Sequence, residues 1–139
     1  FGSFGITLEQ ILAKGSGSSG LSIQTMYYPA TYNSWINLSL QSQSGWVAFG
    51  SGYSTPQYTK SADKLVSLKG LIKSGTTTSG TIIATLPAGY RPGARLLITG
   101  VSVHSYCRID IDIDGNIILK AGGSSTWLAL DNITFYAEK

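Results

Sequence analysis

The feature that most constrains the fold of this chain is a series of short segments in which apolar and polar residues alternate. In residues 64–73, for example, the apolar residues Val66 and Leu68 share one face of an extended chain. The polar residues Ser67 and Lys69 share the other face. Glycine lies at most of the segment boundaries, as tight turns require. The predicted strands are residues 22–28, 36–41, 46–50, 57–60, 64–73, 80–86, 95–103, 107–113, 116–121 and 126–138.

Many short strands with turn signals at close spacing predict an antiparallel sheet structure. The segment between one predicted strand and the next is too short for a helical crossover, which argues against a parallel α/β sheet. We therefore expect an all-β fold, an antiparallel β-sandwich of the jelly-roll-like kind. Gly70, inside one strand, indicates a bulge or a close approach of another backbone.

The stretch RIDIDIDGNIILK, residues 108–120, resembles the opening of a calcium-binding EF-hand loop. Asp110, Asp112, Asp114 and Gly115 fit the pattern D-x-[DN]-x-[DN]-G. The loop also needs a glutamate at its twelfth position, where this chain has Ala121. An EF-hand is therefore excluded, and a weak surface cation site is the most that the carboxylates could form.

The same stretch fits a β-hairpin better. Ile109, Ile111 and Ile113 fall on one face of a strand, and Asp110 and Asp112 fall on the other. The turn follows at Asp114-Gly115 or Gly115-Asn116. We expect the isoleucines to be buried and the aspartates to form a solvated acidic face.

The N-terminal part of the chain differs from the rest. Residues 7–14, TLEQILAK, predict a helix of about two turns, too short to be stable alone in water. It should pack on its own domain or on copies of itself. Residues 15–20, GSGSSG, have the composition of a flexible linker. We expect a helix and linker over residues 1–20 and a β-sandwich head domain over residues 21–139.

Charge and residue usage exclude several classes of function. The net charge of +3 comes from scattered lysines and arginines, so we expect no nucleic-acid surface. One histidine, His104, and one cysteine, Cys107, are too few for a zinc site or a Cys-His couple, and we expect neither metal nor cofactor. Cys107 is predicted to be a buried structural thiol. No stretch is apolar for the length of a membrane span, and no signal peptide is recognisable, so no membrane insertion is expected.

The carboxylates give no strong catalytic signal. A glycosidase usually needs two carboxylates that flank the scissile bond. Asp110 and Asp112 would be neighbours on one strand face, but no second constellation accompanies them. We therefore expect a protein that is not an enzyme and has no catalytic residue.

Aromatic residues are the best candidates for ligand binding. Aromatic rings have apolar faces and polar edges, which suit stacking on sugar rings and also subunit contacts. Trp46 and Trp127 each begin an apolar strand and are predicted to pack in the core. The candidate ligand-binding residues are Tyr27, Tyr28, Tyr32, Trp35 and Tyr53.

Four stretches together resemble the C-terminal domains of bacteriophage tail fibres and of tail-tip or baseplate appendages. They are WINLSLQSQSGWVAFGSGY (residues 35–53), YTKSADKLVSLKGLIKSGT (58–76), TIIATLPAGYRP (81–92) and WLALDNITFYAEK (127–139). The resemblance implies a head domain at the distal end of a phage tail, extracellular on the virion and usually a homotrimer. Its partners would be a saccharide or protein of the host surface and other tail proteins. None of the matched motifs is a binding motif, so no site residue follows from it.

Four functions stay open at this stage. The first is a phage tail component that adheres to a host cell, with a trimer that strengthens weak binding to a repeating glycan through avidity. The others are a carbohydrate-binding module of a secreted cell-wall enzyme, a passive tail-decoration domain, and a tail-associated glycan hydrolase that uses Asp110 and Asp112.

Overall fold

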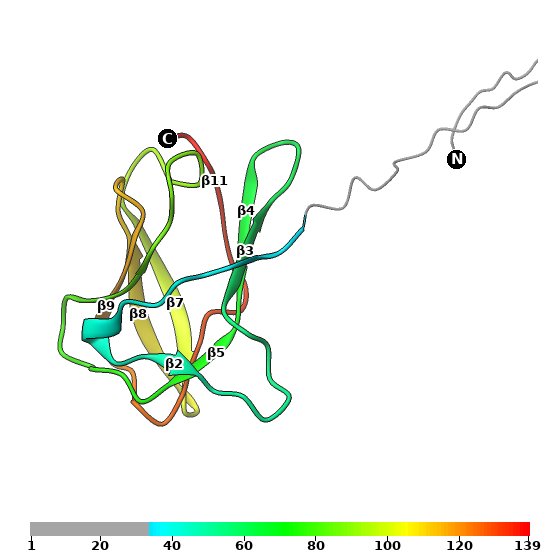
Figure 1. Cartoon of the computed structure of the whole chain (residues 1–139). Coiled ribbons are helices and arrows are strands. Elements are labelled where there is room, and N and C mark those ends of the chain that lie inside the picture. The colour runs from blue at the N-terminus through cyan, green and yellow to red at the C-terminus, as the bar shows by residue number, and fades with distance from the viewer. Residues whose placement is uncertain (1–33) are drawn as a thin grey trace, which may run out of the picture. The chain divides into compact units, whose positions relative to one another are not determined.

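The computed structural model describes residues 34–139, and these form an all-β domain with two antiparallel sheets (Figure 1). The smaller sheet has the strand order β1-β3-β4-β11. Its strands are β1 (Ile36–Asn37), β3 (Gln57–Lys60), β4 (Leu65–Lys69) and β11 (Ile133–Tyr136). The predicted helix and linker of residues 1–20, the predicted strand at residues 22–28 and the start of the predicted head domain at residue 21 lie outside the described residues.

The larger sheet has the order β2-β5-β10-β7-β8-β9-β6. Its strands are β2 (Val47–Ala48), β5 (Leu71–Lys73), β6 (Thr81–Thr85), β7 (Leu96–Ser102), β8 (Ser105–Ile111), β9 (Asn116–Ala121) and β10 (Leu128–Ala129). In Figure 1, β2 and β5 lie across the direction of β7 and β8, so this sheet is strongly curled. Within residues 34–139 the one helical element is the 3-10 turn η1 (Ser42–Ser44).

The inward faces of both sheets share one apolar core, which confirms the predicted sandwich of antiparallel sheets. Trp46 is buried in this core as predicted, and its indole packs directly on Gly75, where a side chain would overlap the ring. Cys107 is also buried and free, as expected for a structural thiol. Burial raises the pKa of the Cys107 thiol, which keeps it protonated and unreactive.

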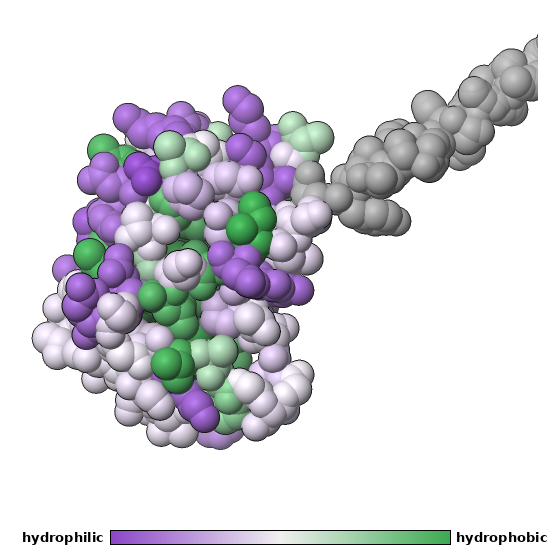
Figure 2. Space-filling model, in the orientation of Figure 1, coloured by the Kyte–Doolittle hydropathy of each residue, from purple (hydrophilic) through white to green (hydrophobic). Residues whose placement is uncertain are grey.

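Some apolar side chains stay outside the core. In the view of Figure 2, apolar residues form a band down the middle of the molecule between more polar flanks. Exposed apolar residues of the described chain include Ile36 of β1 and Val47 of β2. Both strands are edge strands with two residues each, and short edge strands leave little backbone for unwanted pairing.

Two segments predicted as single strands each divide between the sheets. Residues 64–73 form β4 in the smaller sheet and β5 in the larger one, with the break at Gly70. Residues 126–138 form β10 in the larger sheet and β11 in the smaller one. In residues 64–73 the alternation keeps one phase, since Val66, Leu68 and Ile72 are all buried, so it does not reveal the break at Gly70. In residues 126–138 the phase shifts by one residue between Leu130 and Ile133, and this shift marks the second break.

The two breaks lie together and are hydrogen-bonded to each other. The Gly70 N–H donates to Asp131 Oδ1 at 3.0 Å, and the Leu130 N–H donates to the Gly70 carbonyl at 2.8 Å. The predicted close approach at Gly70 is confirmed, because a Cβ there would lie 2.5 Å from the Pro56 Cα. Its φ of +136° also favours glycine. This corner fixes where both strands leave one sheet and enter the other.

The hairpin at residues 108–120 is confirmed, with β8 and β9 antiparallel. Ile109 and Ile111 are fully buried, whereas Ile113 lies in the turn and is exposed, contrary to prediction. The Gly115 N–H donates to the Asp112 carbonyl, and Gly115 has a φ of +85°. The Asp112 carboxylate accepts two backbone N–H groups, from Asp114 and from residue 116, and it therefore belongs to the turn and not to an acidic face.

The expected solvation of Asp110 is wrong, because its side chain is completely buried. Arg95 Nε donates to Asp110 Oδ2 at 2.8 Å, and Arg108 donates through Nε to Oδ1 and through Nη2 to Oδ2. These hydrogen bonds, led by those from Arg108, hold the pKa of the Asp110 carboxyl below its usual value although burial opposes this. The arginines cover the carboxylate and shield it from solvent.

Replacement of Gly70 by alanine tests the corner. Gly70→Ala should lower the free energy of unfolding by about 2 kcal/mol, because the new Cβ collides with the backbone of Pro56. Gly80→Ala is the matched control, since Gly80 also has a positive φ but no atom within 4 Å of the added Cβ, and it should cost about 1 kcal/mol. Urea unfolding measures both. Equal losses would show that backbone conformation alone matters at Gly70.

Acid should weaken the Asp110 interaction. A carboxyl whose pKa is depressed on folding stabilises the protein above its unfolded pKa of about 3.9, and this stabilisation is lost as the pH falls through the folded pKa. Asp110→Asn should cost about 2 kcal/mol at pH 7, and the difference from the native protein should shrink between about pH 5 and pH 2.

Urea midpoints across that pH range measure this difference. Asp114→Asn is the control, because within residues 34–139 the Asp114 carboxylate has no hydrogen-bond donor. A constant difference between the native protein and Asp110→Asn at all pH values would contradict the interpretation.

Candidate functional site

An aromatic cleft with a volume of about 610 Å³ lies on the outer face of the larger sheet. Leu71 of β5 and Ala129 of β10 are cross-strand partners and form its floor. The walls come from the segment after β2, from the residues on either side of β10 and from the turn between β7 and β8. The lining residues are Phe49, Gly52, Tyr53, Ser54, Leu71, His104, Trp127, Ala129 and Asp131.

The first wall is formed by the residues on either side of β10. Strand alternation turns these residues, together with Ala129 of the floor, toward the cleft. Leu128 and Leu130 are fully buried in the core, so Trp127, Ala129 and Asp131 must face outward. Trp127 was predicted to pack in the core, and this is wrong: it is half-buried and lines the cleft. The period of two was present in the sequence, but the large area of a tryptophan favoured the core.

The second wall is a tight turn that carries Tyr53. The Tyr53 N–H donates to the Gly50 carbonyl at 3.0 Å, and the two central residues, Ser51 and Gly52, both have positive φ. The Tyr53 ring packs edge-on against Phe49, with 5.2 Å between ring centroids. The Phe49 backbone is bonded to β5 by its N–H, so the turn is held on the sheet. The ring of Tyr53 thereby stays at the cleft with 59% of its surface exposed.

The third wall is the two-residue turn between β7 and β8. Val103 and His104 have φ values of +46° and +64°, the pattern of a type I′ hairpin turn. A positive φ is strained for a β-branched residue such as Val103. The turn places the His104 ring edge-on against Trp127, with 6.0 Å between centroids. Strain of this kind often accumulates at functional sites.

A buried serine ties this turn to the tryptophan. The Ser102 hydroxyl donates to the Trp127 carbonyl at 2.6 Å and accepts the Ser124 N–H at 2.8 Å. Ser102 is almost completely buried, so both bonds are shielded from water. The backbone that carries Trp127 is therefore fixed from β7, and the cleft is preformed.

The structure divides the predicted ligand residues. Tyr53 lines the cleft. Trp35 is exposed but lies outside the lining, with the Lys69 ammonium 4.3 Å from its ring centroid. Tyr27, Tyr28 and Tyr32 lie outside the described residues.

Of the lining residues, sequence reasoning proposed only Tyr53 as a ligand residue. Besides Trp127, which it assigned to the core, it did not single out the side chains of Phe49, His104 and Asp131 for ligand binding. The alternation from Trp127 to Asp131 was a signal for the last of these, whereas nothing local marks the other two. They reach the cleft only because the larger sheet brings β2, the β7–β8 turn and β10 together.

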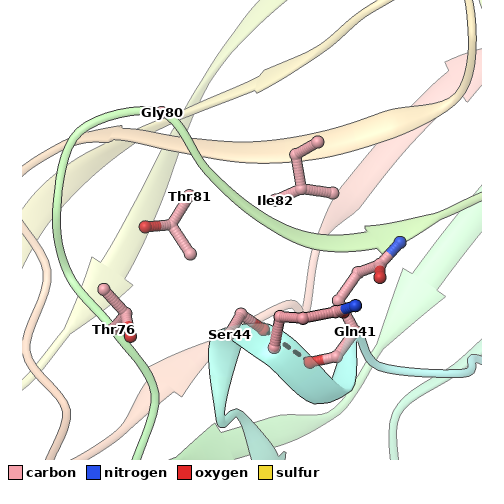
Figure 3. Close-up of a pocket in the computed structure, with 7 residues that line it drawn as sticks. Gln41, Ser44, Thr76, Gly80, Thr81 and Ile82 are labelled. Carbon is pink, nitrogen blue, oxygen red and sulfur yellow. Dashed lines mark hydrogen bonds between the residues drawn. The ribbon is translucent and has the colours of Figure 1, made fainter.

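A second hollow, of about 450 Å³, lies between η1 and the start of β6 (Figure 3). Its lining is largely polar and uncharged, with Gln41 and Ser44 on one side and Thr81 and Ile82 on the other. The Ser44 hydroxyl donates to the Gln41 carbonyl at 2.8 Å and so is already used by the fold. No aromatic ring from the described part of the chain lines this hollow, and we regard the aromatic cleft as the better candidate site.

The chemistry of the aromatic cleft suits a polyhydroxylated ligand. Trp127 and Tyr53 offer rings for the apolar face of a sugar. Asp131 accepts the Gly70 N–H through Oδ1 and has a second oxygen for a ligand hydroxyl, while His104 and Ser54 supply further polar atoms. No group of three metal-ligating side chains occurs within residues 34–139, and no helix there is long and apolar enough to cross a membrane.

Fold and cleft together define a class of protein, a two-sheet β-domain with an aromatic cleft on the outer face of its larger sheet. A solved structure of the same fold is the receptor binding protein (gp15) of Listeria phage PSA. It is 21% identical, with a TM-score of 0.64 over 81% of this chain and 69% of that chain. The predicted resemblance to phage tail proteins is thus confirmed at the level of the fold. No protein-family model matches the sequence, and no curated protein sequence is significantly similar to it.

The strain in the β7–β8 turn can be measured. Val103→Asn should stabilise the domain by about 1 kcal/mol, because asparagine adopts a positive φ more readily than valine does. Val101→Asn, two residues earlier in β7 with ordinary strand geometry, is the control and should destabilise it. Thermal unfolding measures both variants. A loss of stability in Val103→Asn would show that the valine packs well enough to outweigh its strain.

Proposed function

We propose that this chain is the receptor-binding head of a phage tail, a non-enzymatic adhesin located on the virion that binds a host-surface saccharide in the aromatic cleft. The observation that carries the proposal is the cleft itself, where Tyr53, Trp127 and Asp131 converge on a preformed hollow. The fold is that of a protein described as receptor-binding, which supports the tail location and the adhesive role.

The absence of catalysis is part of the proposal. A carboxylate that acts as a general acid or nucleophile must reach its substrate. The Asp110 carboxylate is covered by Arg95 and Arg108, and Asp112 accepts hydrogen bonds from its own turn. This arrangement argues against a hydrolase that uses these two aspartates. Oligosaccharides incubated with the protein should be recovered intact.

We also propose that the head acts as a homotrimer, since three weak sites on a repeating glycan bind more tightly than one. Light scattering of the purified chain gives its mass in solution. A monomer would favour a carbohydrate-binding module or a decoration domain.

Cleft substitutions test the saccharide proposal. Tyr53→Ala and Trp127→Ala should each weaken binding of a host-surface oligosaccharide about tenfold, as expected when a stacking contact of about 1.4 kcal/mol is lost. Tyr53 is exposed, so its replacement should leave the fold unchanged. Calorimetry with a panel of host oligosaccharides and adsorption of labelled protein to host cells provide the measurements.

Trp35→Ala is the matched control, because Trp35 is an exposed aromatic residue outside the cleft lining. It should bind like the native protein. Equal affinities for the native protein and both cleft variants, or no binding to any glycan, would overturn the saccharide proposal.

A further inference from the structure

The arginines that cover Asp110 lie on the same outer face of the larger sheet as the cleft. On β8, Tyr106, Arg108 and Asp110 alternate with the core residues Cys107 and Ile109 and so face outward. The cross-strand partners of these three on β7 are Val101, Thr99 and Leu97, which are exposed. Arg95 precedes β7 and reaches diagonally to Asp110.

Asp110 holds both guanidinium groups in place. Arg108 binds it with two nitrogens, at 2.8 and 3.0 Å, and Arg95 binds it with one at 2.8 Å. Asp110 is completely buried, whereas the arginine side chains are about half exposed. Folding has therefore already restricted the two arginine side chains, so a ligand that binds them would cost little further side-chain entropy.

The guanidinium groups keep donors for a ligand. Within residues 34–139, neither terminal nitrogen of Arg95 has a hydrogen-bond partner. In Arg108, Nη2 has a partner there but Nη1 does not. The two arginines and the Asp110 carboxylate sum to one positive unit, and the Asp112 carboxylate interacts electrostatically with Arg95 from outside this cluster. We propose that Arg95 and Arg108 form a binding site for a singly charged oxyanion, the carboxylate or phosphodiester group of a ligand.

Guanidinium geometry selects this class of ligand. Arginine presents several N–H donors in a planar fork that matches the oxygens of a carboxylate or phosphate group. A single negative charge would neutralise the cluster. Tyr106 is 80% exposed, and Leu97 and Val101 are also exposed beside the arginines, so apolar parts of a ligand would find contacts there.

The sheet register connects this oxyanion site with the aromatic cleft. Ala129 in the cleft floor pairs with Val101, which pairs with Tyr106 on β8. Arg108 lies two residues further along β8, which places its Cα about 12 Å from the Ala129 Cα, given ordinary strand spacing and rise. An extended saccharide with a ring in the cleft could therefore place an anionic group on the arginines. This spanning arrangement rests on the proposed function, whereas the oxyanion site does not.

Small anions test the site without any saccharide. Acetate and dimethyl phosphate should cause saturable NMR shifts confined to Arg95, Arg108 and their neighbours, and neutral acetamide should cause none. Arg95→Gln should weaken anion binding at least fivefold while Arg108 keeps both of its bonds to Asp110. Whichever anion binds more tightly identifies the source, a carboxylate or a phosphodiester.

Lys64→Gln is the matched control, because it removes one positive charge just before β4 of the smaller sheet. It should leave anion binding unchanged. Shifts that do not saturate, or an equal loss in Lys64→Gln, would show general salt screening and overturn the proposal.

The two proposals fail separately. Tyr53→Ala should leave acetate and dimethyl phosphate binding intact, since Tyr53 is not part of the arginine cluster. If the head binds these anions but no saccharide, the oxyanion site stands and the saccharide function falls. If neutral saccharides bind and the anions do not, the oxyanion site falls alone.

Discussion

The structure depends on one corner, where two segments of chain pass from one sheet to the other and hydrogen-bond to each other. The bonds between Gly70, Leu130 and Asp131 join these passages. At Gly70 the alternation continues unbroken, so these bonds and the positive φ of the glycine set the position of the first passage, whereas the second passage coincides with a shift in alternation after Leu130. The corner also sets the site, since Asp131 holds the Gly70 N–H with one oxygen and lines the cleft with its side chain.

The cleft is made of features that cost stability locally and are held by the rest of the fold. Val103 and His104 adopt left-handed backbone, and a buried hydroxyl, that of Ser102, fixes the chain that carries Trp127. A rigid site loses little entropy when a ligand binds, which would favour binding of the saccharide proposed above. The Asp110 cluster follows the same logic, because a buried charge orients two exposed arginines.

Prediction from sequence succeeded where a residue's environment is decided by its neighbours in the chain. The antiparallel sheets, the β8–β9 hairpin and the burial of Ile109, Ile111 and Cys107 are all confirmed. It failed for Asp110, since the arginine of β8 is local but Arg95 arrives from before β7. Tyr53 was predicted as a ligand residue because it is an aromatic residue in a turn-rich segment, and it lines the cleft, whereas His104, Trp127 and Asp131 reach the cleft from other strands and turns. Its role in binding stays a prediction.

The sequence by itself determined the class of fold, because alternation with a period of two dictates strands and glycine-rich boundaries dictate turns. It also determined which faces are apolar. Only the tertiary structure decided that the two long segments pass from one sheet to the other, which side of the larger sheet carries the cleft, and which outward residues meet there. The physical reason is that pairing between strands and the curl of a sheet are non-local, so residues such as Phe49, His104 and Asp131 become neighbours only once the sheet has closed around its core.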